Sequence, residues 1–191
     1  MKNELELLLE NFVAQGEQEI VDLAIFRQFA QDEKNFTRET MAHFTASAFV
    51  LNEKRDKVLG IFHRIYQSWG WLGGHADGDT DLVRVARKEV QEESGLTDLK
   101  LLSSAPISIE NLPVFGHFHR THGYVSAHLH LNVTFLFEAK EGQKLRENRD
   151  ETGGLAWIAL DEFSKKSSEK EMKVIYDKII LRIKKDKEDK K

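Results

Sequence analysis

The sequence predicts an α/β fold, in which a mixed β-sheet lies between layers of helices and extra helices stand at both ends. Three observations support this prediction. Strand-like segments recur from residue 43 to residue 160 and are joined by hairpin turns and long loops. A helical pattern between Thr80 and Gly95 interrupts them. Apolar residues at helical spacing precede and follow them, and this order of elements is typical of a three-layer α/β/α sandwich.

The first 38 residues predict a helical extension that packs on the domain behind it. Apolar residues recur at helical spacing from Leu5 to Val13 and again from Ile20 to Ala30, and Gly16 separates the two runs. We expect residues 39–184 to form the main domain, including a C-terminal helix. Residues 185–191 are all charged, and we expect a polar tail without regular structure from Lys184 onward.

Residues 43–52 and 57–65 have strand propensity and flank a polar turn, so they predict an antiparallel hairpin. A short apolar strand, residues 69–72, follows. Trp69 and Trp71 alternate along it and should face the same way. They could form a stacking wall for a base, with Trp69 as a candidate substrate-binding residue, but we prefer a core position for at least one of them.

The second half of the chain predicts further strands and a final helix. Residues 99–109 are strand-like with a break at Pro106, residues 140–153 form a charged loop, and residues 155–160 are a last strand. Residues 168–184 predict a helix, and its apolar stripe consists of Met172, Ile175, Tyr176, Ile179 and Ile183.

Composition limits the class of protein. The chain has 191 residues, with 28 Lys and Arg against 32 Asp and Glu, and its net charge of −4 gives no signal for a nucleic-acid or membrane partner. It has no cysteine, which excludes disulfides, thiolate zinc sites and a cysteine nucleophile. Because no apolar run reaches transmembrane length and the N-terminus does not read as a signal peptide, we expect a cytoplasmic protein.

Three carboxylates in the central helix are the main functional signal. Glu89, Glu92 and Glu93 stand at positions i, i+3 and i+4, which share one side of a helix within about 100°. A hard divalent cation such as Mg²⁺ would relieve their repulsion and bridge them to a substrate phosphate. Glu89 and Glu93 border the apolar stripe, so we expect both to be partly desolvated. The alternative is an ordinary surface helix with an acidic end.

The ends of this helix are also marked. Asp79 or Thr80 is a suitable N-cap, and Gly95 stands where a left-handed residue would end the helix. The whole stretch from Gly73 to Leu96, GGHADGDTDLVRVARKEVQEESGL, resembles the Nudix box, the signature of the Nudix hydrolases. The positions that match are Gly74, Glu89, Val90, Glu92, Glu93, Gly95 and Leu96.

Two positions depart from this signature, because Thr80 stands where the family has Glu and Lys88 where it has Arg. The opening GGHADGD is similar to that of a bacterial branch of the family. The resemblance spans roughly residues 40–165 and implies the Nudix fold, a sandwich of the kind described above. It also implies that Glu89, Glu92, Glu93 and the backbone carbonyl of Gly73 hold Mg²⁺ or Mn²⁺.

The resemblance implies further catalytic residues. Lys88 would orient a neighbouring carboxylate or contact phosphate as a point charge, since lysine keeps the charge of arginine but lacks its fork. Many Nudix hydrolases draw an extra glutamate from the loop before a Trp-bearing last strand. Glu151 is that candidate here, as ligand or general base, with Glu147 as its substitute and Glu89 as the other possible base. The alternative is that Glu147 and Glu151 are surface charges.

A histidine-rich stretch, residues 117–130, and His75 complete the candidate site. In the strand of residues 126–139, period two puts His128, His130, Asn132 and Thr134 on one face and apolar residues on the other. A zinc site is one interpretation, but the spacing fits no defined zinc motif. We favour His128 and His130 as pocket residues that bind substrate, with solvent exposure as a close alternative. His75 could contact phosphate or have no task.

The expected activity is metal-dependent hydrolysis of a phosphoanhydride in a nucleoside diphosphate linked to another moiety. The alternative is a catalytically weak, nucleotide-binding regulatory module on the same fold. A zinc hydrolase or zinc-stabilised protein built on the histidines is a more distant one. We expect a small nucleotide or diphosphate as partner, and the N-terminal helices or an edge strand could support a homodimer.

Overall fold

The computed structural model describes residues 3–64, 66–119, 123–147 and 152–189. In this part of the chain, eight strands form one mixed sheet. They are β1 (Ala42–Asn52), β2 (Lys57–His63), β3 (Ser68–Gly70), β4 (Leu72–His75), β5 (Leu99–Leu101), β6 (Ser108–Val114), β9 (His128–Ala139) and β10 (Thr152–Ala159). The main order is β10-β2-β1-β9-β5, and β3, β4 and β6 pair with β2, β1 and β9 respectively.

The centre of the sheet is the parallel pair β1 and β9. Their register runs from Ala42 opposite Leu129 to Asn52 opposite Ala139. β2 and β4 pair antiparallel with β1, and β6 pairs antiparallel with β9. The hairpin expected from residues 43–65 is therefore confirmed, and the strand carrying the two glycines lies directly beside β1.

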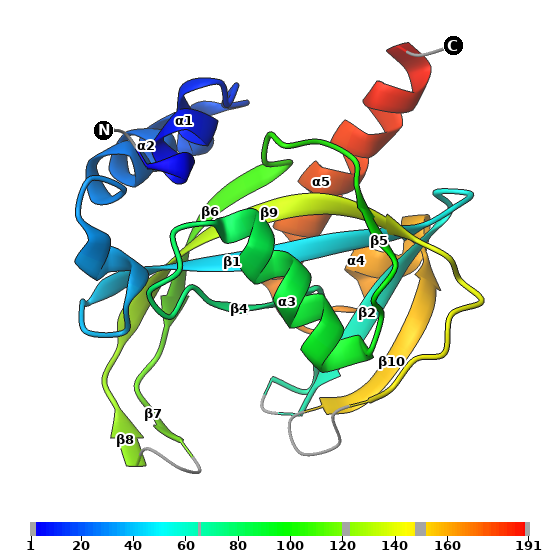
Figure 1. Cartoon of the computed structure of the whole chain (residues 1–191). Helices are drawn as coiled ribbons and strands as arrows, with labels where there is room; N and C mark the ends of the chain where they lie inside the picture. The colour runs from blue at the N-terminus through cyan, green and yellow to red at the C-terminus, as the bar shows by residue number, and fades with distance from the viewer. Residues whose placement is uncertain (1–2, 65, 120–122, 148–151, 190–191) are drawn as a thin grey trace.

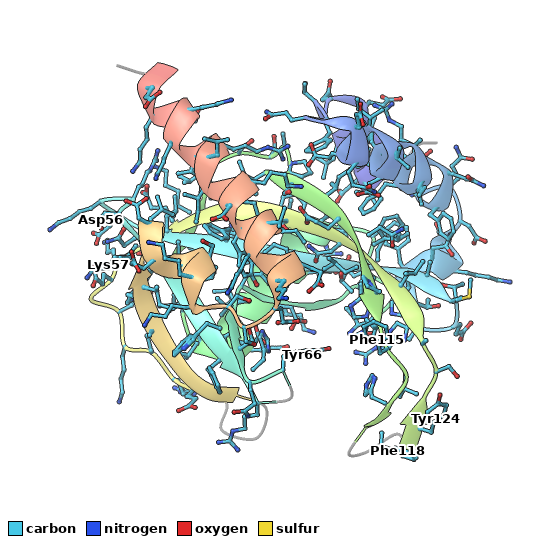
Figure 2. All side chains as sticks on the ribbon, turned by 180° about the vertical axis from the view of Figure 1, so that it is seen from behind. Asp56, Lys57, Tyr66, Phe115, Phe118 and Tyr124 are labelled. Atoms are coloured by element: carbon cyan, nitrogen blue, oxygen red, sulfur yellow. The ribbon has the colours of Figure 1, made fainter. Side chains whose placement is uncertain are left out.

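Helices cover both faces of this sheet (Figure 1). They are α1 (Glu4–Glu10), α2 (Glu17–Phe29), α3 (Leu82–Ser94), α4 (Phe163–Lys166) and α5 (Lys170–Asp189), with short 3₁₀ turns at Glu33–Phe36 and Leu160–Glu162. α3 lies on one face, and α4 and α5 lie on the other (Figures 1 and 2). The predicted three-layer α/β/α sandwich is confirmed. None of the helices in the described residues is long and apolar enough to cross a membrane.

Side-chain alternation along β1 divides the core into two parts. Ala46 and Ala48 point into the apolar cluster that includes Leu82, Val85 and Val90 of α3. Phe49 and Leu51, on the other face, point into the cluster beneath α4 and α5. The predicted stripe of α5 lies in this second cluster, where Tyr176, Ile179 and Ile183 are buried and Met172 and Ile175 are partly buried.

The N-terminal helices share the first core rather than standing apart from it. Leu5, Leu9 and Phe26 are fully buried in the same cluster as Phe44 of β1, and the Phe26 and Phe44 rings meet edge to face at 5.7 Å. Gly16, with φ of 87°, separates α1 from α2 as the sequence predicts.

Three expected boundaries differ. The N-cap of α3 is Asp81, whose side chain accepts from Arg84 N at 3.0 Å, because Asp79 is engaged by Asp81 N and by Arg84. The unstructured tail expected from Lys184 is wrong as far as Asp189, since α5 continues to that residue. The strand after Pro106 reaches Val114 and passes through Pro113, which an edge strand tolerates because its outer side needs no donor.

A small arm projects from the sheet. β7 (His117–His119) and β8 (Gly123–Val125) pair with each other and form a separate two-stranded sheet. The arm and the turn before it carry exposed aromatic side chains, Phe115, Phe118 and Tyr124 (Figure 2). Phe118 and Tyr124 meet at 5.5 Å, so the arm carries its own small aromatic pair.

Candidate active site

The central helix α3 presents two of its carboxylates to β4. The backbone N–H of Gly73 donates a hydrogen bond to Glu93 Oε2 at 3.0 Å. A Cβ added to Gly74 would lie 2.5 Å from both Cδ and Oε2 of Glu89. The Glu89 carboxylate therefore occupies the space that any side chain at position 74 would need. Both glutamates are half-buried, as expected from their position beside the apolar stripe.

Gly73 has a different structural reason to be glycine. A Cβ at this position would lie 2.6 Å from the backbone oxygen of Ala46 and from Ser47 Oγ. Gly73 and Gly74 face opposite sides of β4, because neighbours in a strand alternate. The glycine pair thus brings β4 close to β1 through Gly73 and close to α3 through Gly74.

Glu92 lies in a more open environment than the other two carboxylates. Its side chain is 56% exposed, and its Oε1 lies 3.6 Å from Lys88 Nζ, which is 60% exposed. The structure therefore brings Glu89 and Glu93 together against β4 and leaves Glu92 at the solvent side with Lys88. Gly95 ends the helix in the left-handed conformation, with φ of 75°, as the sequence predicts.

The loop between β4 and α3 is held by two arginines. Arg38 donates to both carboxylate oxygens of Asp77, at 2.6 and 2.8 Å. Arg84 binds Asp79 in the same two-pronged way. The Asp77 hydrogen bond raises the pKa of Arg38, burial opposes this, and the charges of Asp77 and Glu89 add to the rise. Arg38 thus lies within electrostatic reach of a box carboxylate, and sequence reasoning did not identify it.

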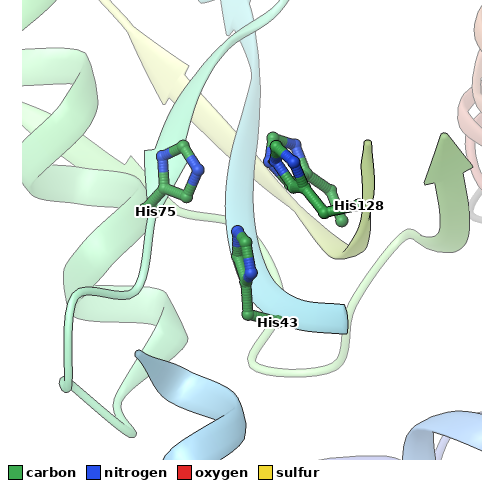
Figure 3. Close-up of side chains that lie close together, drawn as sticks. His43, His75 and His128 are labelled. Carbon is green, nitrogen blue, oxygen red and sulfur yellow. The ribbon is translucent and has the colours of Figure 1, made fainter. Parts of the chain in front are cut away.

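Four histidines converge on the other face of the sheet. They are His43 of β1, His75 of β4, and His128 and His130 of β9. One ligand atom from each lies within 4.8 Å of the other three, and His128 Nε2 and His130 Nε2 are 3.1 Å apart. Figure 3 shows the rings of His43, His75 and His128 turned toward a common space. We call these four residues the histidine cluster.

Strand pairing explains why these residues meet. His43 lies opposite His130 in the β1–β9 register, and His75 lies opposite Thr45 in the β1–β4 register. Sequence reasoning singled out His75, His128 and His130 but missed His43, because nothing local distinguishes that residue. His117 lies on β7, away from the group, and the side chains of His119 and His122 lie outside the described part of the chain.

Burial keeps three of the cluster's rings uncharged, those of His43, His75 and His130. It lowers the pKa of His75 to about 4 and that of His130 to about 2. Arg38 and the neighbouring histidines add to the effect on both rings, and Asp77 opposes it at His75. Burial also lowers the pKa of His43, which is only 4% exposed. These three rings are therefore neutral at pH 7 and can offer lone pairs.

The polar face of β9 continues as a buried hydrogen-bond network. Thr45 and Ser47 donate to Asn132 Oδ1 at 3.1 and 2.8 Å, and Asn132 Nδ2 donates to Thr134 Oγ1 at 3.0 Å. Asn132 is 2% exposed and Thr134 is fully buried. The alternative prediction, that the polar face of β9 is exposed to solvent, is therefore wrong for these two residues. Burial raises the pKa of the adjoining Glu110.

The remaining candidates lie elsewhere. Trp71 is buried against Tyr176, as we preferred for at least one tryptophan. Trp69 packs on Phe62 and borders the cluster beneath α4 and α5, so the structure does not group it with the carboxylates, and its role in substrate binding stays a prediction. Glu151 lies outside the described residues, and Glu147 is partly buried in the preceding loop.

A cavity of about 350 Å³ lies at the Leu51 end of β1, opposite the end that carries His43. Leu51, Pro106 and Ile183 are among its lining residues. It shares no residue with the carboxylates or with the histidine cluster, so it does not contribute to the candidate active site.

Comparison with known structures supports the same fold. The E. coli dihydroneopterin triphosphate pyrophosphohydrolase is 14% identical, with a TM-score of 0.56 over 72% of this chain and 94% of that one. A C. elegans Ap4A hydrolase, solved as a binary complex, is 16% identical, with a TM-score of 0.55 over 73% and 96%. A Nudix-family hydrolase from Clostridium perfringens is 18% identical, with a TM-score of 0.52 over 74% and 97%.

Sequence comparison identifies the family. A search of curated proteins found no significant match. The family model of the NUDIX domain matches residues 41–179, which is most of the chain and includes β4, α3 and their glycine and glutamate contacts. The chain therefore belongs to the Nudix family and is a pyrophosphohydrolase of the Nudix type.

Proposed function

We propose that the chain hydrolyses a phosphoanhydride bond in a nucleoside diphosphate linked to another moiety, and that it requires Mg²⁺ or Mn²⁺. The proposal is supported chiefly by one observation, the pair of half-buried carboxylates that α3 holds against Gly73 and Gly74. Two carboxylates held this close to backbone, with a third one turn away, form an all-oxygen donor set. Hard divalent cations prefer such sets.

The residues fit the metal on a structural criterion as well. The space beside Gly74 is filled by the Glu89 carboxylate, and a single methyl group there would displace it. Glu89, Glu92, Glu93 and the Gly73 carbonyl would hold the cation. When bound, the cation would neutralise the diphosphate and lower the pKa of a coordinated water.

The chain's own side chains would supply the remaining catalytic roles. Glu89 would accept the proton of the attacking water, with Glu151 as the other candidate base. Arg38, whose side chain is 52% exposed and lies within electrostatic reach of Glu89, would bind a substrate phosphate, since a guanidinium matches phosphate oxygens in two-pronged geometry. Lys88 would keep Glu92 oriented from 3.6 Å or contact phosphate itself.

The proposed reaction class agrees with the name of one structural relative. The E. coli protein is named for a triphosphate that it cleaves as a pyrophosphohydrolase. At 14% identity this relative supports the reaction class for the present chain and not its particular substrate.

The test is to incubate the purified protein, in the presence of Mg²⁺ or Mn²⁺, with a panel of nucleoside triphosphates, dinucleotides, nucleotide sugars and ADP-ribose. Hydrolysis of each substrate is then measured. We expect Glu89→Gln and Glu93→Gln each to lower metal-dependent turnover by roughly 10²–10⁴-fold. Glu162→Gln is the control, because it makes the same change at a glutamate outside the site, where Glu162 forms an exposed ion pair with Lys165.

Two outcomes would contradict the proposal. Full turnover in both glutamate variants would remove the carboxylates from the reaction. Absence of turnover across the panel, combined with thermal stabilisation by a nucleotide, would support the regulatory binding module instead.

A further inference from the structure

The histidine cluster has the composition of a metal site that differs from the carboxylate site on α3. We propose that His43, His75, His128 and His130 together bind one transition-metal ion of the zinc class. The four rings come from three strands, and their ligand atoms lie within 4.8 Å of one another.

Hydrogen bonds to backbone carbonyls fix the direction of two of the rings. His43 Nδ1 lies 3.1 Å from the carbonyl oxygen of Thr40, and His128 Nδ1 lies 2.8 Å from that of Ser126. Because a carbonyl only accepts, each Nδ1 must carry the proton, and each neutral ring then has its lone pair on Nε2. Metal-binding histidines commonly have this outer-shell arrangement, which sets both tautomer and orientation.

One inward-facing nitrogen of the cluster has no hydrogen-bond partner within the described residues, and two others share a single hydrogen bond. His43 Nε2 is buried and has no hydrogen-bond partner within the described residues. His128 Nε2 faces His130 Nε2 at 3.1 Å, so at most one N–H of His130 can serve that pair. A buried acceptor without a partner is unfavourable. A cation at the centre of the cluster would bind all of these lone pairs at once.

The spacing requires only small adjustments. Zinc binds imidazole nitrogen at 2.0–2.1 Å, so tetrahedral ligands lie about 3.4 Å apart. The widest separation allowed by the 4.8 Å limit would need to shrink by about 1.4 Å, while His128 and His130 are already close. Ring rotation can supply this movement, because His75, His128 and His130 are only half-buried.

The donor chemistry selects the ion. Imidazole suits Zn²⁺, Cu²⁺ and Ni²⁺, whereas Mg²⁺ takes oxygen ligands, and the cluster contains no carboxylate among the described side chains. Side chains alternate along β4, so Gly74 faces Glu89 and His75 faces the other side of the sheet. The two sites would thus take different metals on opposite faces of one strand.

A bound ion would also connect the central strands. His43, His75 and the β9 histidines join β1, β4 and β9 at the end of the sheet where the two-stranded arm begins. β4 holds the glycines that position Glu89 and Glu93, so the ion would restrain the strand on which the carboxylate site is built.

The experiment is zinc binding to the full chain after treatment with EDTA and removal of the chelator. Titration calorimetry should give one Zn²⁺ per chain, and Zn²⁺ should raise the melting temperature without nucleotide present. Co²⁺ should give visible absorption bands of a four-coordinate nitrogen site. Mg²⁺ at the same concentration should give no signal at this cluster.

Variants locate the site. His75→Gln and His128→Gln should each weaken zinc binding by roughly 100-fold. Loss of an outer-shell partner usually lowers metal affinity by roughly 10–100-fold, and these two variants each remove a ligand itself. His117→Gln is the matched control, since His117 Nδ1 also contacts a carbonyl, that of Phe115, but lies outside the cluster. Both cluster variants replace half-buried rings, and circular dichroism will verify that each folds.

Three results would overturn the proposal. One is absence of zinc binding above the level of nonspecific sites, which would leave a buried water or hydrogen-bonded imidazoles as the content of the cluster. Another is equal affinity in His75→Gln, His128→Gln and His117→Gln. The third is loss of zinc binding in Glu93→Gln, because this would place the zinc on the carboxylates of α3. Zinc binding that survives Glu93→Gln supports a separate site whatever the activity assays give.

Discussion

The backbone amide of Gly73 donates a hydrogen bond to Glu93 across twenty residues of sequence. This contact, together with the close approach of Glu89 to Gly74, fixes α3 against β4 with two carboxylates turned toward the strand. A side chain at Gly73 would meet β1, whereas a side chain at Gly74 would meet the Glu89 carboxylate, so substitutions at the two adjacent glycines should have different effects.

Substitution of the glycines should separate catalysis from stability. In Gly74→Ala the new methyl group meets only the end of the Glu89 side chain, so we expect turnover to fall by about 10-fold or more with little change in melting temperature. In Gly73→Ala the methyl group meets the Ala46 backbone, and we expect a stability loss of about 1–3 kcal/mol. Steady-state kinetics and urea unfolding measure the two effects. The same loss of stability in both variants would contradict this assignment.

Arg38 should contribute to substrate binding. Its side chain lies within electrostatic reach of Glu89 and is half-exposed, so Arg38→Gln should lower kcat/KM by about 10-fold or more through loss of a phosphate contact. Arg84→Gln is the control, because Arg84 binds Asp79 in the same loop with the same two-pronged geometry. If both variants lost activity equally, the effect would come from the loop and not from a phosphate contact.

A buried ion pair should hold the first and last helical segments together. Arg182 of α5 donates to both oxygens of Glu19 in α2, at 2.9 and 2.6 Å, and the two side chains are 8% and 3% exposed. Burial raises the pKa of Glu19, but the Arg182 hydrogen bond, together with Gln15 and Lys178, outweighs it, and the pKa is lowered overall. The two charges therefore depend on each other.

Removal of one partner should cost more than removal of both. Arg182→Met leaves the Glu19 carboxylate buried with less compensation, and we expect a loss of about 3–5 kcal/mol in the free energy of unfolding. The double variant Glu19→Gln with Arg182→Met should be more stable than the single one, which urea unfolding of the four proteins in a double-mutant cycle will measure. Additive losses would mean that the two residues act independently.

The free energy of unfolding of the metal-free protein should fall as the pH is lowered, because His75 and His130 bind protons less readily in the folded chain than in the unfolded chain. The pKa of His75 is about 4 and that of His130 about 2 in the folded chain, against 6.5 for the ordinary side chain. Below pH 6.5 the unfolded chain binds protons that the folded chain does not, so stability is full above that pH and is lost as pH falls toward 4. Each such histidine contributes a slope of about 1.4 kcal/mol per pH unit.

Urea unfolding in EDTA at intervals between pH 7.5 and pH 4.5 measures this dependence. Other titratable or charged groups also act on His75 or His130, namely His43, His128, Arg38 and Asp77, so the informative quantity is the difference between the wild-type chain and His130→Gln. We expect the variant to have the shallower slope. Equal slopes would show that His130 titrates alike in the folded and unfolded states.

Local sequence determined the parts of this protein that depend on spacing within one element. The carboxylates of α3 and the left-handed Gly95 follow from helical periodicity and from the conformational freedom of glycine. The alternation of β9 and the stripe of α5 follow in the same way, and their apolar faces lie in the core as predicted. Family resemblance added the fold and the reaction class.

Only the tertiary structure decided which distant residues meet. His43 joins His75, His128 and His130 because β1 pairs with both β4 and β9, and strand pairing brings together residues far apart in sequence. The same holds for Arg38 beside the box loop and for Glu19 against Arg182. The polar face of β9 alternates as a solvent-exposed face would, yet Asn132 is buried, because its partners Thr45 and Ser47 come from β1 and satisfy its hydrogen bonds. Periodicity sets which side of a strand a residue occupies, but only long-range pairing sets what lies across from it.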